Sequence, residues 1–354
     1  MAEKNLDCFF TTNESAMLYE CGFSCDNAIY FKAQSEAFFI TDSRYTLEAR
    51  QKANKNTQII ESKDLIKDFI KLAKNTKNII YDNAQISVEF FEKIKALSLK
   101  PKPNFHQIKR AVKSENEIAL IKESQRLNKK AFKRFAKFIA KNDKNLSENK
   151  LNEKKLHFYA RQFLENGGKN DLSFNPIVAL NENAAKPHAL PCKKPLCKGD
   201  LVLFDAGVKY KNYCSDMTRT AFFGSKRRES SKSKDFNFSK SQTFPPKIQK
   251  IYDIVLGAQE CAIKGARSGM KAKEIDKLAR DFIDKKGFGK FFAHSLGHGV
   301  GLDIHELPRI SHKSDEIIKD GMVFSIEPGI YLPNEFGVRI EDLVVMKNGR
   351  AEVL

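Results

Sequence analysis

Along the first 110 residues, apolar positions recur with two different periods. The segment NAIYFKAQSEAFFI is rich in aromatic and β-branched residues on both sides of Lys32–Glu36, which predicts two strands joined by a turn, and NIIYD near residue 80 predicts another strand. Helical spacing follows, with one helix expected after a Ser43 cap and another over ISVEFFEKIKAL. This alternation predicts a small α/β N-terminal domain.

Helical spacing then dominates the middle of the chain. After Pro101 and Pro103 interrupt the pattern, SENEIALIKESQRLNKKAFKRFAKFIA predicts a long amphipathic helix. We therefore expect a boundary close to residue 110 and two domains, 1–110 and 111–354, because 354 residues are enough for two cores. Further helices are predicted over EKKLHFYARQFLENG, IQKIYDIVLGAQECAIKGA and KEIDKLARDFIDKKG.

Two apolar stretches of the second domain repeat one pattern. Each reads as a glycine turn, a buried strand, a carboxylate, a glycine, and a returning strand that ends at a second carboxylate. Two such strand pairs related by a pseudo-twofold axis would direct four carboxylates into one cleft. The positions that coincide are Gly199 with Gly321, Leu201–Phe204 with Val323–Ile326, Asp205 with Glu327, and Gly207 with Gly329; the second carboxylates are Asp216 and Glu341.

One histidine joins these carboxylates. His298 lies in HSLGHGVGLDIHE, where glycines at 297, 299 and 301 disfavour a helix and favour an extended, closely approached backbone. Buried carboxylates and an imidazole are costly unless a cation compensates them, and oxygen-rich sites suit Mn²⁺, Co²⁺, Fe²⁺ or Zn²⁺. Four carboxylates fit two divalent ions, which lower the pKa of a shared water toward about 7 and polarise a carbonyl, as amide hydrolysis needs.

At these residues the chain resembles the M24 metallopeptidases of the pita-bread fold, which include methionine aminopeptidase, aminopeptidase P and prolidase. The ligand order of that family, Asp, Asp, His, Glu, Glu, falls on Asp205, Asp216, His298, Glu327 and Glu341. The resemblance implies that Asp205 serves one ion, that His298 and Glu327 serve the other, and that Asp216 and Glu341 bridge both. It also implies Mn²⁺ or Co²⁺, and we expect Mn²⁺.

The resemblance extends beyond the ligands. It implies that Glu327 acts as general base and acid, and that four further residues contact the substrate or its immediate surroundings, as in the aminopeptidase P and prolidase branch. The segment TDSRYTLEA resembles the creatinase-type N-terminal domain of that branch, which methionine aminopeptidases lack. The four further residues are His188, His294, His305 and Arg339.

The expected activity is therefore removal of an N-terminal residue that precedes proline, with peptides that carry proline second as substrates. The alternative within the family is a prolidase, which splits Xaa-Pro dipeptides. A pita-bread binding protein without catalysis is the alternative from a different class, but such relatives lose ligands and this chain keeps all five. Relatives with the same N-terminal domain commonly pair through it, so a homodimer is expected.

Composition narrows the setting. The seven cysteines are odd in number and form no CxxC pair, and no stretch approaches a membrane-spanning length, which favours a cytoplasmic protein with no membrane partner. The net charge of +18 comes from 62 Lys and Arg against 44 Asp and Glu. Because the lysines are spread over the whole chain, we expect no specific nucleic-acid partner.

Several positions are expected to stay outside the site. Residues 225–246 read as a flexible, solvated insertion whose deletion over 226–243 leaves metal binding intact, unless Phe236 and Phe238 dock on the cleft or on a partner subunit. Asp342 is expected on the strand face opposite Glu341. Asp303 and Glu306 are expected in salt bridges or beside the ligands, and His106, His157 and His312 on the surface.

Overall fold

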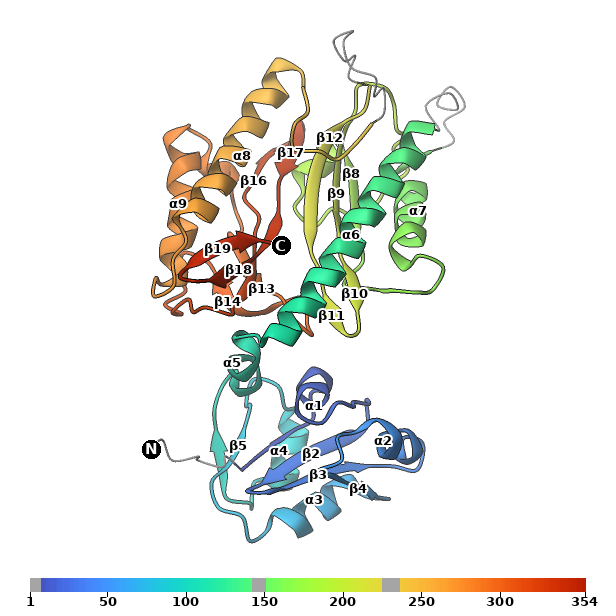
Figure 1. Cartoon of the computed structure of the whole chain (residues 1–354), viewed down its shortest axis with the longest axis vertical. Helices are drawn as coiled ribbons and strands as arrows, with labels where there is room; N and C mark the ends of the chain where they lie inside the picture. Colours follow the sequence, from blue (N-terminus) through green and yellow to red (C-terminus); the bar gives the residue numbers. More distant parts are fainter. Residues whose placement is uncertain (1–7, 142–150, 225–235) are drawn as a thin grey trace. The chain divides into compact units, whose positions relative to one another are not determined.

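The computed structural model describes residues 8–141, 151–224 and 236–354. By its internal contacts the chain divides into two compact units, Met1–Arg110 and Ala111–Leu354 (Figure 1). Each unit has its own sheets and its own buried apolar clusters, so each is described separately.

The N-terminal unit is built on one six-stranded mixed sheet in the order β4-β3-β2-β1-β5-β6. The predicted strand pair is confirmed as β2 and β3, which run antiparallel, and NIIYD as β5. The strands are β1 (Phe9–Thr11), β2 (Ala28–Ala33), β3 (Glu36–Thr41), β4 (Thr57–Glu61), β5 (Ile79–Tyr81) and β6 (Leu99–Pro101). The helices are α1 (Glu14–Cys21), α2 (Thr46–Lys52), α3 (Leu65–Ala73), α4 (Val88–Ile94) and α5 (Phe105–Ala111), whose last residue lies at the unit boundary.

Two sequence predictions for this unit are wrong. Ser43 does not cap α2, because the Tyr45 and Thr46 backbone N–H groups donate to the Asp42 carbonyl at 3.1 Å and the helix begins only at Thr46. His106 is not on the surface: it is 2% exposed and packs edge-on against Phe9.

The C-terminal unit contains several smaller sheets between helices. Its helices are α6 (Glu115–Lys141), α7 (Glu153–Glu165), α8 (Pro246–Gly265) and α9 (Ala272–Lys285), with short 3₁₀ turns η2 (Asn181–Ala185) and η3 (Gly289–Phe291). The first strands are β7 (Asp171–Leu172), β8 (Ile177–Leu180), β9 (Leu201–Ala206), β10 (Val208–Tyr210), β11 (Tyr213–Cys214) and β12 (Met217–Phe222). The later strands are β13 (Gly297–Gly299), β14 (Glu306–Ile310), β15 (Val323–Ile326), β16 (Gly329–Leu332), β17 (Phe336–Arg339), β18 (Asp342–Lys347) and β19 (Arg350–Val353).

The predicted internal repeat is confirmed by the strand pairing. β9 pairs antiparallel with β12, and β15 pairs antiparallel with β18. Between the two members of each pair the chain forms a short hairpin, β10–β11 in the first half and β16–β17 in the second. Gly199 and Gly321 precede the two halves with φ of +96° and +84°, a region that other residues rarely adopt.

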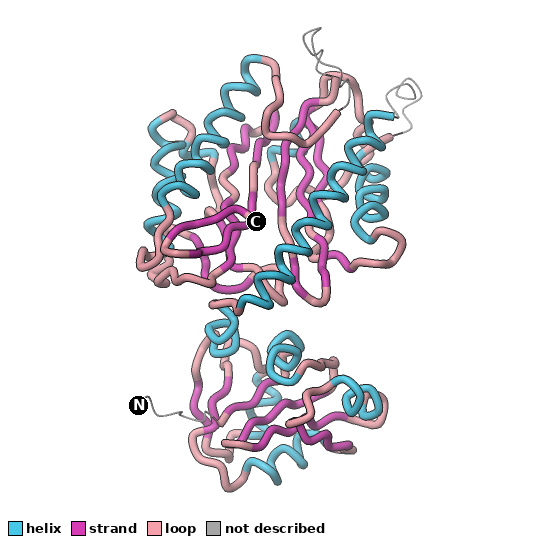
Figure 2. The backbone as a smooth tube through the Cα atoms, viewed as in Figure 1, coloured by secondary structure: helices cyan, strands magenta, loops and turns pink. Residues whose placement is uncertain are grey.

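Helices cover the outer side of each half (Figures 1 and 2). The amphipathic helix α6 and its neighbour α7 bury Phe132, Phe135 and Leu156 against β9 in one apolar cluster. Helices α8 and α9 bury Val255 and Ile275 in a second cluster with residues of β15, β16 and β18. These layers hold both strand pairs in place and leave their carboxylates on the inner side.

The segment that precedes α8 departs from expectation. The part of the insertion at 225–235 lies outside the described residues, but residues 236–245 are not a solvated loop. Phe238 is 9% exposed and its ring centroid lies 5.5 Å from that of Phe204 in β9. The aromatic pair at 236 and 238 supplies enough apolar surface for this segment to pack on the core.

Hydropathy gives no candidate for a membrane-spanning segment. Among the helices within the described ranges, none combines the length and the apolar character needed to cross a bilayer.

Candidate metal centre

The structure brings the five predicted ligands together from both halves of the repeat. Asp205 lies near the end of β9 and Asp216 immediately before β12. Glu327 follows β15, Glu341 precedes β18, and His298 is the central residue of β13. Strands far apart in sequence thus present one imidazole and four carboxylates to one region.

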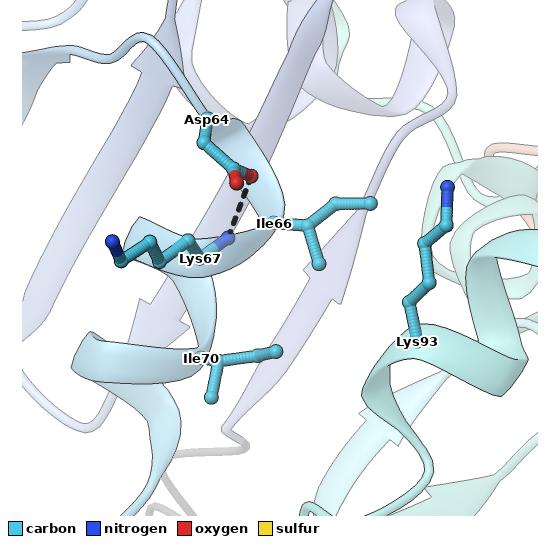
Figure 3. Close-up of a pocket in the computed structure, with 5 residues that line it drawn as sticks. All are labelled: Asp64, Ile66, Lys67, Ile70 and Lys93. Atoms are coloured by element: carbon cyan, nitrogen blue, oxygen red, sulfur yellow. Dashed lines mark hydrogen bonds between the residues drawn. The ribbon is translucent and has the colours of Figure 1, made fainter.

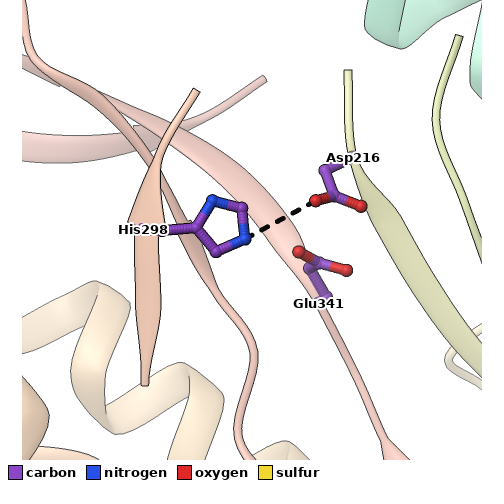
Figure 4. Close-up of side chains that lie close together, drawn as sticks. All are labelled: Asp216, His298 and Glu341. Atoms are coloured by element: carbon purple, nitrogen blue, oxygen red, sulfur yellow. Dashed lines mark ion pairs between the residues drawn. The ribbon is translucent and has the colours of Figure 1, made fainter. Parts of the chain in front are cut away.

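The geometry is that of a cluster able to hold a divalent ion. Ligand-type atoms of Asp216, His298 and Glu341 all lie within 4.8 Å of one another (Figure 4). The His298 Nε2 atom lies 3.7 Å from Asp216 Oδ2 and 3.3 Å from Glu327 Oε1. Its Nδ1 atom lies 3.2 Å from the carbonyl oxygen of Gly299, which orients the ring so that Nε2 faces the carboxylates.

The glycines around His298 are required by close backbone packing, as the sequence predicted. A Cβ atom added to Gly297 would lie 1.9 Å from the Ser325 carbonyl oxygen, and one added to Gly299 would lie 2.2 Å from that of Leu307. Because β13 pairs with both β14 and β15 at close range, only glycine fits on either side of His298.

The carboxylates influence one another strongly. Burial, followed by the charges of Glu341 and Asp205, raises the pKa of Asp216 well above its ordinary value. Burial, followed by Glu327 and Asp205, raises the pKa of Glu341 in the same way. Burial also raises the pKa of Asp205, although the Arg339 guanidinium opposes the shift. The centre therefore concentrates more negative charge than it can hold without a cation.

Glu327 differs from the other three carboxylates. Burial acts to raise its pKa, but the hydrogen bond and the charge of His298 outweigh burial and lower the pKa of Glu327 to about 2. The Ser325 hydroxyl donates a further hydrogen bond to Glu327 Oε1 at 3.0 Å. Glu327 consequently carries its charge at neutral pH.

Three carboxylate oxygen atoms of the centre are available to bind a metal ion. Asp205 Oδ1, Asp216 Oδ1 and Glu341 Oε1 are buried, and each is without a hydrogen-bond partner among the described residues. A buried carboxylate oxygen without a partner costs about 1–3 kcal/mol or more, so such atoms call for a ligand. Carboxylate oxygens with one imidazole are donors that divalent ions such as Mn²⁺ and Zn²⁺ accept.

Arg339, the last residue of β17, connects the two halves of the repeat through side-chain hydrogen bonds. The guanidinium donates to Asp205 Oδ2 at 2.6 Å, to Thr218 Oγ1 at 3.0 Å and to the Tyr331 hydroxyl at 2.8 Å. Thr218 in turn donates to Glu341 Oε2 at 2.7 Å. The resemblance implied that Arg339 contacts the substrate or its immediate surroundings, and the structure places its guanidinium on Asp205.

Sequence reasoning missed Thr218 and Tyr331. Thr218 lies two residues after Asp216 and Tyr331 four residues after Glu327, both on strands that return from a predicted ligand. Because side chains alternate along a strand, residues two and four apart share a face, and this spacing is the signal that identifies them.

The three accessory histidines lie in different surroundings. The His294 ring contacts the Tyr331 hydroxyl at 2.9 Å through Nε2, and burial lowers the pKa of His294. The His305 ring centroid lies 4.3 Å from that of His298. Part of His305 remains exposed, and the partial loss of solvent around its ring is the main cause that lowers its pKa. His188 follows η2, is exposed, and its charge contributes to lowering the pKa of both other histidines.

The carboxylates that were set aside have structural partners. Glu306 Oε2 accepts a hydrogen bond from Lys113 Nζ at 3.0 Å, and both side chains are 1% exposed. Asp342 pairs with Arg219 at 2.5 Å and, as expected, does not join Glu341 in the cluster.

The N-terminal unit carries a separate surface pocket (Figure 3). Its one carboxylate, Asp64, accepts a hydrogen bond from the Lys67 backbone N–H at 3.0 Å and thereby caps α3. The pocket contains none of the five predicted ligands, and Asp64 is already occupied, so we assign no chemistry to it. The lining residues are Asp64, Ile66, Lys67, Ile70 and Lys93.

An N-terminal α/β unit, a repeated pair of strands and a buried cluster of one imidazole and four carboxylates together define a two-domain metallohydrolase. The chain belongs to metallopeptidase family M24: residues 119–348 match that family, and residues 1–114 match the Creatinase/Prolidase N-terminal domain. The resemblance inferred from the ligand order, and the fold class that it implied, are confirmed.

Proteins with similar sequences are named as peptidases. The chain is 35% identical over 301 residues to an uncharacterized peptidase of Staphylococcus epidermidis, covering 84% of this chain and 78% of that relative. It is 37% identical over 245 residues to an uncharacterized peptidase of Staphylococcus aureus, a match that covers 69% of this chain. In that second match the chain spans 62% of the relative.

Solved structures of similar proteins cover almost the whole chain. An Xaa-Pro dipeptidase from Bacillus anthracis is 29% identical with a TM-score of 0.83 and covers 98% of this chain and 92% of its own. The prolidase from Pyrococcus furiosus is 30% identical, with a TM-score of 0.81 and coverage of 100% and 97%. An X-Pro aminopeptidase from Thermotoga maritima is 30% identical, with a TM-score of 0.79 and coverage of 98% and 95%.

Proposed function

We propose that this protein is a dinuclear metal-dependent aminopeptidase that hydrolyses the Xaa-Pro bond at the N-terminus of peptides. The observation that carries the proposal is the convergence of five ligand-type side chains in which three buried carboxylate oxygens have no partner among the described residues. Family membership and the peptidase names of the relatives support it.

The five side chains would hold two divalent ions, which we propose to be Mn²⁺. Asp205 would serve one ion, His298 and Glu327 the other, and Asp216 and Glu341 would bridge both. When bound, the ions would lower the pKa of a water molecule at the site and polarise the carbonyl of the scissile bond. The raised pKa values of Asp216 and Glu341 support this assignment, because a bound cation would offset both the burial and the repulsion that raise them.

Glu327 is proposed as the general base and acid. It is ionised at neutral pH, which a proton acceptor requires, and it lies 3.3 Å from His298 among the other proposed ligands. The proton would then be passed to the proline nitrogen as the bond breaks. Ser325 would keep the accepting carboxylate oriented through its hydrogen bond.

The accessory residues are proposed to bind and orient the peptide. His294 contacts Tyr331 and His305 lies beside His298, and these two histidines and His188, when neutral, can each donate a hydrogen bond to a substrate carbonyl or to the developing oxyanion. Arg339 is committed to Asp205 and Tyr331, so its proposed role is to hold these groups and the Pro187 carbonyl, which it contacts at 3.2 Å.

A prolidase is the second candidate. The solved structures of an Xaa-Pro dipeptidase and of a prolidase resemble this chain as well as that of an X-Pro aminopeptidase does. Both activities hydrolyse the bond between the first residue and proline with the same kind of metal site. They differ in whether the active site accepts substrates with further residues after proline.

Product analysis by mass spectrometry distinguishes these candidates. Metal-stripped protein is incubated with Mn²⁺ or with chelator on an Xaa-Pro-Xaa tripeptide, an Xaa-Pro dipeptide and a Met-Ala-Xaa tripeptide. We expect Mn²⁺-dependent release of the first residue from the proline tripeptide. Cleavage confined to the dipeptide identifies a prolidase instead, and stoichiometric metal binding without cleavage of any peptide would support a binding protein.

We further propose a cytoplasmic homodimer. None of the seven cysteines forms a disulfide within the described residues, which suits a reducing compartment. Light scattering coupled to size exclusion measures the oligomeric state directly, and a mass close to the 40.3 kDa of one chain would contradict the dimer.

A further inference from the structure

One lysine of the segment 236–245 forms an ion pair with the second half of the repeat. Lys240 Nζ lies 2.5 Å from Asp342 Oδ2, and Asp342 is 2% exposed and directly follows Glu341. The Tyr252 hydroxyl donates to the Lys240 carbonyl at 3.3 Å and holds the lysine backbone in place. These contacts attach the segment to β18, directly after a predicted metal ligand, while the buried Phe238 packs on β9.

Asp342 also connects this lysine to the backbone of the centre. Arg219 Nη2 lies 2.5 Å from Asp342 Oδ1, and Arg219 Nη1 donates to the carbonyl oxygens of Glu341 and Thr218. The carboxylate of Asp342 is thus held between two cations, one of which fixes the peptide plane that follows the Glu341 side chain.

Lys240 has a second partner, Gln259, which is fully buried in α8. Lys240 Nζ lies 2.7 Å from Gln259 Oε1, and the Gln259 amide nitrogen donates to the carbonyl oxygens of Ile326 at 3.1 Å and Ile340 at 3.2 Å. These carbonyls immediately precede Glu327 and Glu341.

Lys240 and three acceptors agree on which way the Gln259 amide faces. Because Lys240 can only donate, it bonds the amide oxygen, while the NH₂ group donates to the two carbonyls and, at 3.2 Å, to Asp342 Oδ2. Without Lys240, the NH₂ group keeps its acceptors, but the buried amide oxygen loses the Lys240 donor and Asp342 loses one of its two cationic partners.

We propose that Lys240 is a positioning residue for the metal ligands Glu327 and Glu341, acting from behind them through Asp342 and Gln259. The inference rests on the proposed metal-binding role of these two glutamates. A partly exposed ion pair alone stabilises a fold little, and the Lys240 side chain is 33% exposed, so its main effect is on ligand geometry. It gives the segment before α8 a function in the metal site.

The test compares Lys240→Met with Lys240→Arg and with Lys247→Met. Lys247 is the matched control, because it lies seven residues further on and pairs with Glu335 at the surface, 66% exposed. Mn²⁺ titration of metal-stripped protein by calorimetry gives the affinity, thermal melting in chelator gives the stability without metal, and peptide kinetics give kcat and KM.

We expect Lys240→Met to weaken Mn²⁺ binding about tenfold, as removal of groups that orient ligands does. The melting temperature in chelator should change little, and kcat should fall while KM stays near the wild-type value. Lys240→Arg, which retains a donor for Asp342, should recover most of the affinity, and Lys247→Met should match wild type.

Wild-type Mn²⁺ affinity in Lys240→Met would overturn the inference, whether or not that variant melts earlier. Failure of the wild-type protein to take up Mn²⁺ would instead overturn the proposed metal site itself, so the two failures are distinguishable. Should Lys240→Met not fold, Lys240→Gln replaces it with the same expected loss of affinity.

Discussion

At the scale of single residues, the centre is organised by differences among four carboxylates. Three have raised pKa values and buried oxygens that no described group satisfies, whereas Glu327 is paired with His298 and has a lowered pKa. This contrast separates a carboxylate that is ionised at neutral pH from three carboxylates whose ionisation a bound cation would favour. Because a proton acceptor must be ionised before it acts, we assign proton transfer to Glu327.

Glu327→Gln tests that assignment. The amide keeps the size of the side chain but cannot accept the proton, so kcat should fall by about 10²–10⁴. Initial rates with saturating Mn²⁺ measure the loss, and circular dichroism should show an unchanged fold. Turnover at the wild-type rate would show that another group is the base.

Thr218→Val tests the hydrogen bonds beneath the ligands. The substitution is close to isosteric and removes both the bond to Glu341 and the acceptor of Arg339 Nε, so Mn²⁺ affinity should fall about tenfold. The free energy of unfolding should also fall by about 1–3 kcal/mol, since buried polar atoms lose partners. Calorimetric titration and urea unfolding measure the two effects.

The control is Thr57→Val, which changes the same residue type in β4 of the N-terminal unit. It should leave Mn²⁺ affinity unchanged. Equal affinities in both variants would mean that Thr218 does not orient Glu341.

The ligand-type residues were predictable because each sits at a fixed place in a repeated strand pattern. Thr218 and Tyr331 were not singled out, because their partners lie on other strands: Thr218 reaches Glu341 from 123 positions away in the sequence. Local pattern shows which face a residue occupies, but it does not show what lies opposite.

At the scale of elements, helix α5 buries a histidine within an aromatic core. His106 Nε2 lies 3.3 Å from the Phe10 carbonyl oxygen, and burial lowers the pKa of His106 to about 4 from an ordinary value of 6.5. The sequence offered no reason to place this histidine inside, because His106 falls in a short helix without a clear apolar period.

This burial predicts an acid-sensitive N-terminal unit. Since the unfolded chain binds the proton near pH 6.5 and the folded unit only near 4, the stabilisation is complete above pH 6.5 and is lost as the pH falls toward 4. The loss amounts to about 3 kcal/mol. Denaturant unfolding at a series of pH values measures it.

His106→Leu, which cannot titrate, should flatten this pH dependence. His312→Leu is the matched control, because His312 is exposed and its removal should leave the slope unchanged. An unaltered slope in His106→Leu would assign the acid sensitivity to other groups.

The sequence predicted the elements better than their ends. The long helix over SENEIALIKESQRLNKKAFKRFAKFIA is α6, and each half of the repeat has the strand pair that its glycines and carboxylates indicated. The cap at Ser43 failed because the Asp42 carbonyl accepts the Tyr45 and Thr46 N–H groups, which are the donors that a Ser43 cap would need. The segment 236–245 was misjudged because Phe238 packs on α6 and β9, which lie far away in sequence.

At the scale of the whole molecule, the two units differ in their dependence on metal. All five predicted ligands lie in the unit Ala111–Leu354, and the unit Met1–Arg110 contributes none. A ligand that binds only the folded state stabilises by about 2.7 kcal/mol at a hundred times its Kd. Removal of Mn²⁺ should therefore destabilise one unit and spare the other.

Hydrogen exchange resolved by peptide mass spectrometry measures this difference within one chain. With Mn²⁺ at a hundred times its Kd, the slowest amides of the C-terminal unit should exchange about a hundredfold more slowly than in chelator, because 2.7 kcal/mol corresponds to that factor. Amides of β2 and β3 in the N-terminal unit serve as the internal control and should not change. Equal slowing in both units would show that they unfold together, whereas no slowing in either would contradict metal binding at the five ligands.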